Sequence, residues 1–201
     1  MSSATDLERF AVDDDDLLTP RNSAIVFIDW QPQMLRGVAN VDHAELRGNA
    51  SHLAAFAKRH GVPTVLTSLV HDDEGGRVAP SLLEVLLGEP VVLRRSMNAW
   101  DDTGFRKAIE STGRRRIVLA GLSTEVCVTW SALDLLEEGY DVFVVDDCCG
   151  AASAAAHRAA VRGMVQAGAM RITSADVARH WRDSENHGRR TGAAVSSYVA
   201  V

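Results

Sequence analysis

The sequence predicts an α/β fold: a doubly wound, six-stranded parallel sheet with helices on both faces, which makes three layers. Two patterns lead to this prediction. Short, continuous apolar runs rich in Val, Ile and Leu are typical of strands buried on both faces, as the strands of a parallel sheet are. Stretches with helical character separate six such runs, and a regular alternation of strand and helix favours a parallel sheet.

The first half of the chain contains three of the six predicted strands. The run at 24–28 (AIVFI) is continuous and β-branched, and a predicted helix over 42–60 follows it. The β-branched run at 63–67 (PTVLT) predicts the second strand. A short helix over 81–87 then leads to a third apolar run at 91–93.

The second half repeats the unit, and glycines mark where its helices end. Gly113, Gly139 and Gly168 come shortly after helical stretches, where glycine commonly terminates a helix. The predicted elements of this half are, in order, a helix at 101–111, a strand at 117–120, a helix at 124–138, a strand at 141–145, a helix at 153–167, a strand at 170–173 and a helix at 175–182.

Length and composition indicate one globular domain. The chain has 201 residues, of which 46% are hydrophobic and 24% charged, the usual balance for a single folded domain. We assign this domain to residues 23–183, between a polar N-terminal lead-in at 1–22 and a C-terminal tail at 184–201. The formal net charge of −6 argues against binding to the phosphate backbone of a nucleic acid.

The number of cysteines and the N-terminal sequence indicate the cellular compartment. Three cysteines are too few, and odd in number, for a disulfide framework, which favours a reducing, cytoplasmic environment. The N-terminus lacks the basic start and apolar run of a signal peptide, and no apolar stretch reaches the ~18 residues typical of a membrane span. We therefore expect a small-molecule substrate rather than a nucleic-acid or membrane partner.

A cysteine after the fourth predicted strand is the first catalytic candidate. In doubly wound sheets, ligands bind outside the carboxyl ends of the strands. Cys127 lies there, at the third position of a helix that begins after Thr124. Free N–H groups at a helix N-terminus lower the pKa of a thiol and can hold an oxyanion. The alternative is a cysteine that packs as a small buried apolar residue.

Asp29 and Arg94 follow two other predicted strands. A carboxylate directly after an apolar strand risks desolvation, which raises its pKa toward that of a useful general base. An arginine can hold that carboxylate and favour the thiolate as a fixed charge, but it does not relay a proton. The alternatives are a capping or loop aspartate and a surface arginine.

No cofactor and no metal are predicted. The sequence contains no GxGxxG, GxxxxGK[ST], HExxH or CxxC motif. His52, His60 and His71 do not have the paired spacing of metal ligands. The other histidines, His157 among them, fit a helix surface or a loop.

Four segments, in this order, resemble the isochorismatase-like cysteine hydrolases: 24–31, 94–105, 117–128 and 137–150. Within the third, the sequence GLSTEVCV is similar to the nucleophile signature of that family. The shorter segments NAWD, TEVCV and HWRD resemble its YcaC-like branch. The resemblance extends from about residue 20 to 183, nearly the whole chain.

This resemblance implies a catalytic triad in which Asp29 is the general base, Cys127 is the nucleophile and Arg94 stands where most members have lysine. It also implies a non-proline cis peptide between Ser123 and Thr124, which would turn nearby backbone N–H groups toward the substrate as an oxyanion hole. A homo-oligomer is a further expectation from the family.

The expected function is that of a metal-independent cysteine hydrolase that cleaves a small amide or related C–N bond. Gln31, Asn98 and Trp100 are the expected lining of the substrate pocket. Nicotinamidases of the superfamily carry an Asp-x-His…His metal site near the second strand. The corresponding segment at 67–73 has one histidine, so neither that metal nor that substrate is expected.

Two other functions remain open. An isochorismatase-type vinyl ether hydrolase would rely on Asp29 without a thiol nucleophile. A non-catalytic, oligomeric binding protein is also compatible with the fold, because fold does not determine function. A thiol redox role is disfavoured because no second cysteine lies in CxxC spacing.

Overall fold

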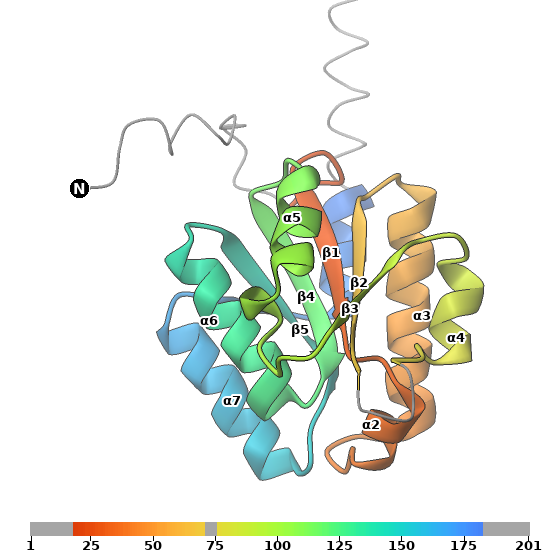
Figure 1. Ribbon diagram of the computed structural model, residues 1–201, viewed down its shortest axis with the longest axis vertical. Helices are drawn as coiled ribbons and strands as arrows, with labels where there is room; N and C mark the ends of the chain where they lie inside the picture. Colours follow the sequence, from red (N-terminus) through yellow and green to blue (C-terminus); the bar gives the residue numbers. More distant parts are fainter. Residues whose placement is uncertain (1–17, 71–75, 183–201) are drawn as a thin grey trace, which may run out of the picture.

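The computed structural model describes residues 18–70 and 76–182. Its centre is a single six-stranded sheet in the order β3-β2-β1-β4-β5-β6, and all neighbouring strands are parallel (Figure 1). The strands are β1 (Ser23–Ile28), β2 (Thr64–Leu69), β3 (Val91–Arg94), β4 (Arg116–Leu122), β5 (Asp141–Gly150) and β6 (Met170–Ile172). The predicted fold class is confirmed.

Helices connect the strands and cover both faces of the sheet. They are α2 (Pro32–Arg36), α3 (His43–Arg59), α4 (Pro80–Val85), α5 (Thr103–Ser111), α6 (Thr129–Glu137) and α7 (Ala154–Gln166), with a 3₁₀ turn η1 (Ala99–Asp101) and a π-helical turn η2 (Thr124–Val128). Residues 174–182 are also helical. Figure 1 shows α3 and α4 on one side of the sheet and α6 and α7 on the other.

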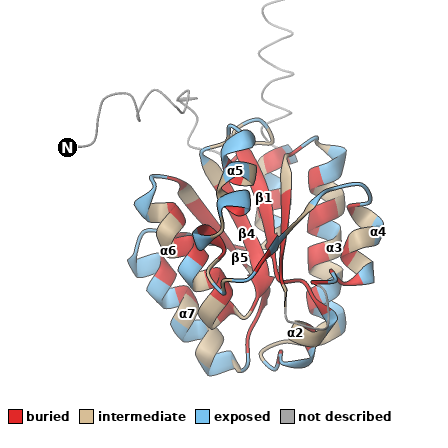
Figure 2. Cartoon of the chain, viewed as in Figure 1, coloured by how far each residue is buried: buried red, intermediate tan, exposed pale blue. Residues whose placement is uncertain are grey.

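The side chains of the central strands alternate between two apolar cores. Ile25 and Phe27 of β1 pack into the core under α3 and α4, whereas Val26 and Ile28 pack into the core under α5 and α6. All six residues of β1 are buried, and Figure 2 shows the central strands as the most deeply buried part of the molecule. This burial explains why these strands are continuous apolar runs in the sequence.

The strand order reverses between β1 and β4. From β1 the chain steps outward to β2 and β3, then returns to the centre as β4 and steps outward the other way. Loops after two such adjacent strands diverge to opposite faces and leave a crevice at the carboxyl edge of the sheet. Asp29 follows β1 and η2 follows β4, so both lie at this switch point.

Two predicted elements differ in extent from the structure, and the short elements α2 and η1 were not predicted. The helix predicted over 124–138 is divided into η2 and α6. The strand predicted at 141–145 continues to Gly150 as β5. Its last residues include two aspartates, and the β4–β5 register shifts between Leu119 and Gly121. An apolar-run criterion does not detect a polar strand end that pairs after such an irregularity.

Within residues 18–70 and 76–182, no helix is long and apolar enough to cross a membrane. The expected lead-in at 1–22 and tail at 184–201 lie largely or wholly outside the described residues. Their boundaries therefore stay predictions.

Candidate active site

Asp29, Arg94 and Cys127 come together at the switch point from three segments that are far apart in the sequence. Asp29 directly follows β1, Arg94 is the last residue of β3, and Cys127 lies in η2 after β4. Their relative exposures are 0%, 1% and 2%. The structure thus places the three predicted catalytic side chains in one site that is closed to solvent.

A buried ion pair joins two of these residues. Arg94 Nη2 donates to Asp29 Oδ2 at 2.5 Å, and both side chains are fully buried. Because β2 lies between β1 and β3, Arg94 must reach across a strand to make this contact, which requires a long side chain. A buried carboxylate is tolerable when a charged donor pairs with it.

The Asp29 carboxylate is held from a second side as well. Its Oδ1 accepts from Leu69 N at 2.9 Å, and its own backbone N–H donates to Thr67 O at 3.0 Å. Asp29 has φ 54°, a left-handed conformation that is unfavourable for residues other than glycine. The surrounding hydrogen bonds offset this cost and orient the carboxylate.

Gln31, an expected pocket residue, also binds the end of β2. Its Nε2 donates to Leu69 O at 2.9 Å, and its Oε1 accepts from Leu69 N at 3.1 Å. Leu69 N–H is therefore shared between Gln31 and Asp29. Gln31 is fully buried, and these bonds give it a role in fixing the carboxylate.

The Arg94 guanidinium uses its second terminal nitrogen to hold the following loop. Nη1 donates to Ser96 O and, at 3.2 Å, to Met97 O. Arg94 Nε is buried and has no hydrogen-bond partner among the described residues.

The Cys127 thiol has a raised pKa, about 12 instead of 9.0. Burial is the main cause, followed by the negative charge of Asp29 and a hydrogen bond to it, while Arg94 acts in the opposite direction. The expectation that the helix N-terminus would lower this pKa is wrong, because desolvation and a neighbouring anion outweigh it. At neutral pH, Cys127 is a thiol next to a carboxylate.

The expected cis peptide between Ser123 and Thr124 is not found, since the described part of the chain contains no cis bond. Ser123 instead adopts a left-handed conformation, with φ 56° and ψ 59°. This conformation turns the chain from β4 into η2. Cys127 consequently sits in a π-helical turn, an element often associated with functional sites.

Side-chain hydroxyls bind the backbone of this nucleophile turn. Ser131 Oγ donates to Cys127 O at 2.7 Å, and Thr129 Oγ1 donates to Thr124 O at 2.6 Å. Thr124 is fully buried, and its Oγ1 donates to Gly150 O at 3.0 Å. The turn is therefore anchored to α6 and to the end of β5.

His157 is a site neighbour that the sequence reasoning missed. Its Nδ1 lies 3.2 Å from Thr124 Oγ1, and its Nε2 lies 3.0 Å from Asp146 Oδ1. His157 thus bridges the nucleophile turn and the middle of β5. No local signal could reveal this contact, since 33 residues separate the two side chains.

Asn98 and Trp100, the other expected pocket residues, lie between β3 and α5. Asn98 Oδ1 accepts from Trp100 N at 3.1 Å, and Asn98 Nδ2 donates to Asp134 Oδ2 at 2.6 Å. The Trp100 ring packs edge-to-face against Phe105 and Tyr140. Both residues thus order this loop, and their contact with a substrate stays a prediction.

Among the described residues, no group of three or more His, Cys, Asp or Glu side chains could hold a metal ion. His71, part of the segment weighed for a metal site, lies outside them.

Comparison with known proteins agrees with this fold. The model of the isochorismatase domain family matches residues 23–176. The chain is 34% identical to the probable hydrolase YcaC of Escherichia coli over 83% of this chain and 82% of that protein. It is 28% identical to maleamate amidohydrolase of Pseudomonas putida over 50% of this chain and 58% of that protein.

Solved structures give the same result. YcaC from Pseudomonas aeruginosa, described with hexane-2,5-diol and covalent acrylamide, superposes with a TM-score of 0.80 at 34% identity over 84% of both chains. The E. coli YcaC gene product, described as an octameric hydrolase of unknown specificity, also has a TM-score of 0.80, with 32% identity over 86% of this chain and 85% of that one.

A doubly wound sheet with these relatives, and with a carboxylate, a cation and a thiol at its switch point, defines a hydrolytic enzyme. The chain belongs to the isochorismatase family and is a hydrolase of that family.

Proposed function

We propose that this hydrolase is a metal-independent cysteine hydrolase that cleaves a small amide or related C–N bond. The burial of Cys127 against Asp29, with Arg94 paired to that carboxylate, carries the proposal. A thiol with a raised pKa is a weak nucleophile by itself, so it needs an adjacent base when it attacks. Asp29 is positioned to be that base.

The proposed reaction begins when Asp29 accepts the thiol proton and Cys127 Sγ attacks the carbonyl carbon. Backbone N–H groups near Ser123, Thr124 and Cys127 hold the oxyanion that develops. The tetrahedral intermediate collapses, the C–N bond breaks, and the amine leaves with the proton from Asp29. Asp29 then takes a proton from water, which attacks the thioester and releases the acid and the free thiol.

Arg94 acts in this scheme as a fixed charge. It holds the carboxylate in place and favours the thiolate that forms during attack, because an arginine stays protonated throughout. Its Nε, which is buried without a hydrogen-bond partner among the described residues, is proposed to donate to a substrate oxygen. Asn98 and Trp100 are proposed to shape the wall of the pocket, and Gln31 to support the base.

Relatives support this chemistry and a multimeric assembly. Acrylamide is an electrophile that thiolates attack, and the P. aeruginosa relative is described with acrylamide bound covalently. The P. putida relative is named for amide hydrolysis. Because the E. coli relative is described as octameric, we also propose a homo-oligomer, which light scattering of the purified protein would measure.

A screen of small amides and carbamoyl compounds, with amine release as the readout, tests the function. Removing a nucleophile or its base typically costs several orders of magnitude in turnover, so we expect Cys127→Ala and Asp29→Asn each to lose at least ~10³-fold in kcat. Cys148→Ala is the matched control, because this cysteine is equally buried but lies outside the site.

The outcomes separate the candidate mechanisms. Activity that survives in Cys127→Ala but is lost in Asp29→Asn would replace the thiol mechanism by the vinyl ether type of chemistry. Full activity in both variants would refute the assignment of the active site.

A further inference from the structure

A second cavity, which contains none of the three triad residues, lies beside α7, the middle of β5 and β6. It has a volume of about 480 Å³, within the usual range for a small-molecule site. Its lining combines charged and aliphatic side chains from these three elements: Asp146, His157, Arg158, Val161, Arg162, Val165, Gln166 and Arg171.

Two arginines of the lining have no counter-ion. Arg158 and Arg162 are one helical turn apart on α7, so they project from the same side of the helix. Both are exposed, and within the described part of the chain neither forms an ion pair. Two unpaired guanidinium groups side by side repel each other and favour an anion between them.

The one acidic residue of the lining is already engaged. Asp146 binds Arg171 and His157 through its two carboxylate oxygens. Burial raises the pKa of Asp146, but these hydrogen bonds outweigh burial and lower it. Asp146 therefore stays ionised and organises Arg171 at the cavity instead of neutralising Arg158 and Arg162.

The local charge is opposite to that of the whole chain. The formal net charge is −6, so no general attraction of anions to this protein is expected. Three guanidinium groups against one carboxylate thus form a local positive site. Val161 and Val165 add an aliphatic wall, which suits an organic anion better than a bare inorganic one.

We propose that this cavity binds a small organic anion, with a carboxylate or phosphate head group held by Arg158, Arg162 and Arg171 and an apolar body against Val161 and Val165. Planar guanidinium groups bind both head groups in bidentate fashion. The cavity contains none of the three proposed catalytic side chains, and His157 of its lining also contacts Thr124 in the nucleophile turn.

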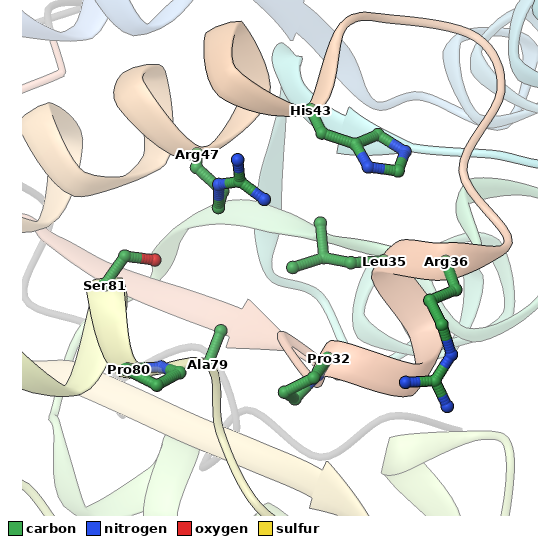
Figure 3. A pocket seen from close by; sticks show the side chains of 8 residues that line it. All are labelled: Pro32, Leu35, Arg36, His43, Arg47, Ala79, Pro80 and Ser81. Atoms are coloured by element: carbon green, nitrogen blue, oxygen red, sulfur yellow. The ribbon is translucent and has the colours of Figure 1, made fainter.

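Another cationic cavity provides a matched comparison. The pocket in Figure 3 has a volume of about 320 Å³ and is lined by residues of α2, α3 and the start of α4, among them Arg36 and Arg47. Figure 3 shows these two arginines on opposite sides of the pocket, and His43 Nε2 is bound to Val38 O. Its cations do not converge, so it serves as the control.

Binding to the full-length protein tests the proposal. Titration calorimetry and saturation-transfer NMR would use benzoate and phenyl phosphate as probes and benzyl alcohol as the neutral analogue. Loss of charge-assisted hydrogen bonds in the Arg158→Gln/Arg162→Gln variant should weaken the affinity for the tighter-binding probe by at least ~10-fold. Arg36→Gln/Arg47→Gln should change its affinity by less than ~2-fold, and added salt should weaken it.

The two probes distinguish a carboxylate from a phosphate ligand. The substituted arginines are exposed, and a thermal melt of each variant verifies that it is folded. Three results would each overturn the proposal: no binding of either charged probe at about 10 mM, equal binding of benzyl alcohol, or equal losses in the two double variants. The last of these would show a general effect of surface charge.

Discussion

At the scale of single residues, the pKa of Cys127 decides how the site can work. A thiol with a pKa of about 12 is not a preformed thiolate at neutral pH. Asp29 is the one acidic side chain among the causes that raise this pKa. Asp29 therefore opposes the resting thiolate yet is placed to remove its proton during attack.

This dual role predicts opposite effects of one substitution. Asp29→Asn removes the charge that raises the Cys127 pKa and leaves Arg94 free to favour the thiolate, so the pKa should fall. Alkylation of Cys127 by iodoacetamide, followed by peptide mass across pH 6–11, should begin at lower pH in the variant, although turnover is lost.

Cys149 is an internal control in the same digest, because burial also raises its pKa to about 12 and Asp29 is not among the causes. A wild-type Cys127 profile that reaches its plateau below pH 8 would contradict the raised pKa.

Arg94 predicts a difference between two substitutions of unlike charge. Arg94→Met leaves the Asp29 carboxylate buried without its cation, which typically costs about 3 to 5 kcal/mol of stability. Arg94→Lys keeps the charge but cannot bind Asp29, Ser96 O and Met97 O at once, so it should lose less stability and retain part of the activity. Urea unfolding of the two variants measures this, and equal stabilities would argue against the buried ion pair.

At the scale of elements, the nucleophile turn depends on how closely β4 approaches β1. Gly121 is paired with Ile28, and a Cβ at Gly121 would lie 2.8 Å from Ile28 Cβ, 2.9 Å from Ile28 O and 2.9 Å from Val128 Cγ2. Two of these neighbours belong to β1 and one to η2. Gly121 thus permits the close approach of β1, which Asp29 follows, to the turn that contains Cys127.

Gly121→Ala should therefore reduce stability and activity together. Overpacking of this kind costs typically about 1 to 3 kcal/mol, and the displaced turn should lower kcat more than it raises KM. Gly163→Ala is the control: this glycine lies inside α7 with nothing within 4 Å of an added Cβ. Alanine there should stabilise the protein by about 0.5 to 1 kcal/mol. A Gly121→Ala enzyme with wild-type stability and kcat would refute the argument.

At the scale of the whole molecule, three buried thiols make folding sensitive to alkaline pH. Burial is the main cause that raises the pKa values of Cys127, Cys148 and Cys149 above the ordinary 9.0. Above pH 9 the unfolded chain releases these protons first, so it is favoured. The contribution of the three protonated, buried thiols to the free energy of unfolding is fully present below pH 9, and it is lost as pH rises through 9 toward 12.

Each thiol contributes a slope of up to about 1.4 kcal/mol per pH unit. Urea unfolding between pH 7 and 11 should therefore show a steep loss in the wild type. The Cys127→Ala/Cys148→Ala protein, which keeps one of the three thiols, should show a shallower loss. If the free energy of unfolding fell equally steeply with pH in the two proteins, the buried thiols would not be the cause of the alkaline loss of stability.

The sequence by itself determined the order of strands and helices and the three catalytic candidates. Buried parallel strands are continuous apolar runs in the sequence, and Asp29, Arg94 and Cys127 come shortly after such runs. Both features are visible in short segments of the chain, so they can be predicted without the tertiary structure. It also predicted the family through short motifs, such as the one at 121–128.

Only the tertiary structure decided which strand ends meet and what the site residues do to one another. The reversal between β1 and β4, and the reach of Arg94 across β2, depend on strand order. The pKa of Cys127 depends on burial and on Asp29, which is 98 residues away in the chain. The contact of His157 with Thr124 has the same origin. Such energies arise from distances in space, and sequence separation does not encode them.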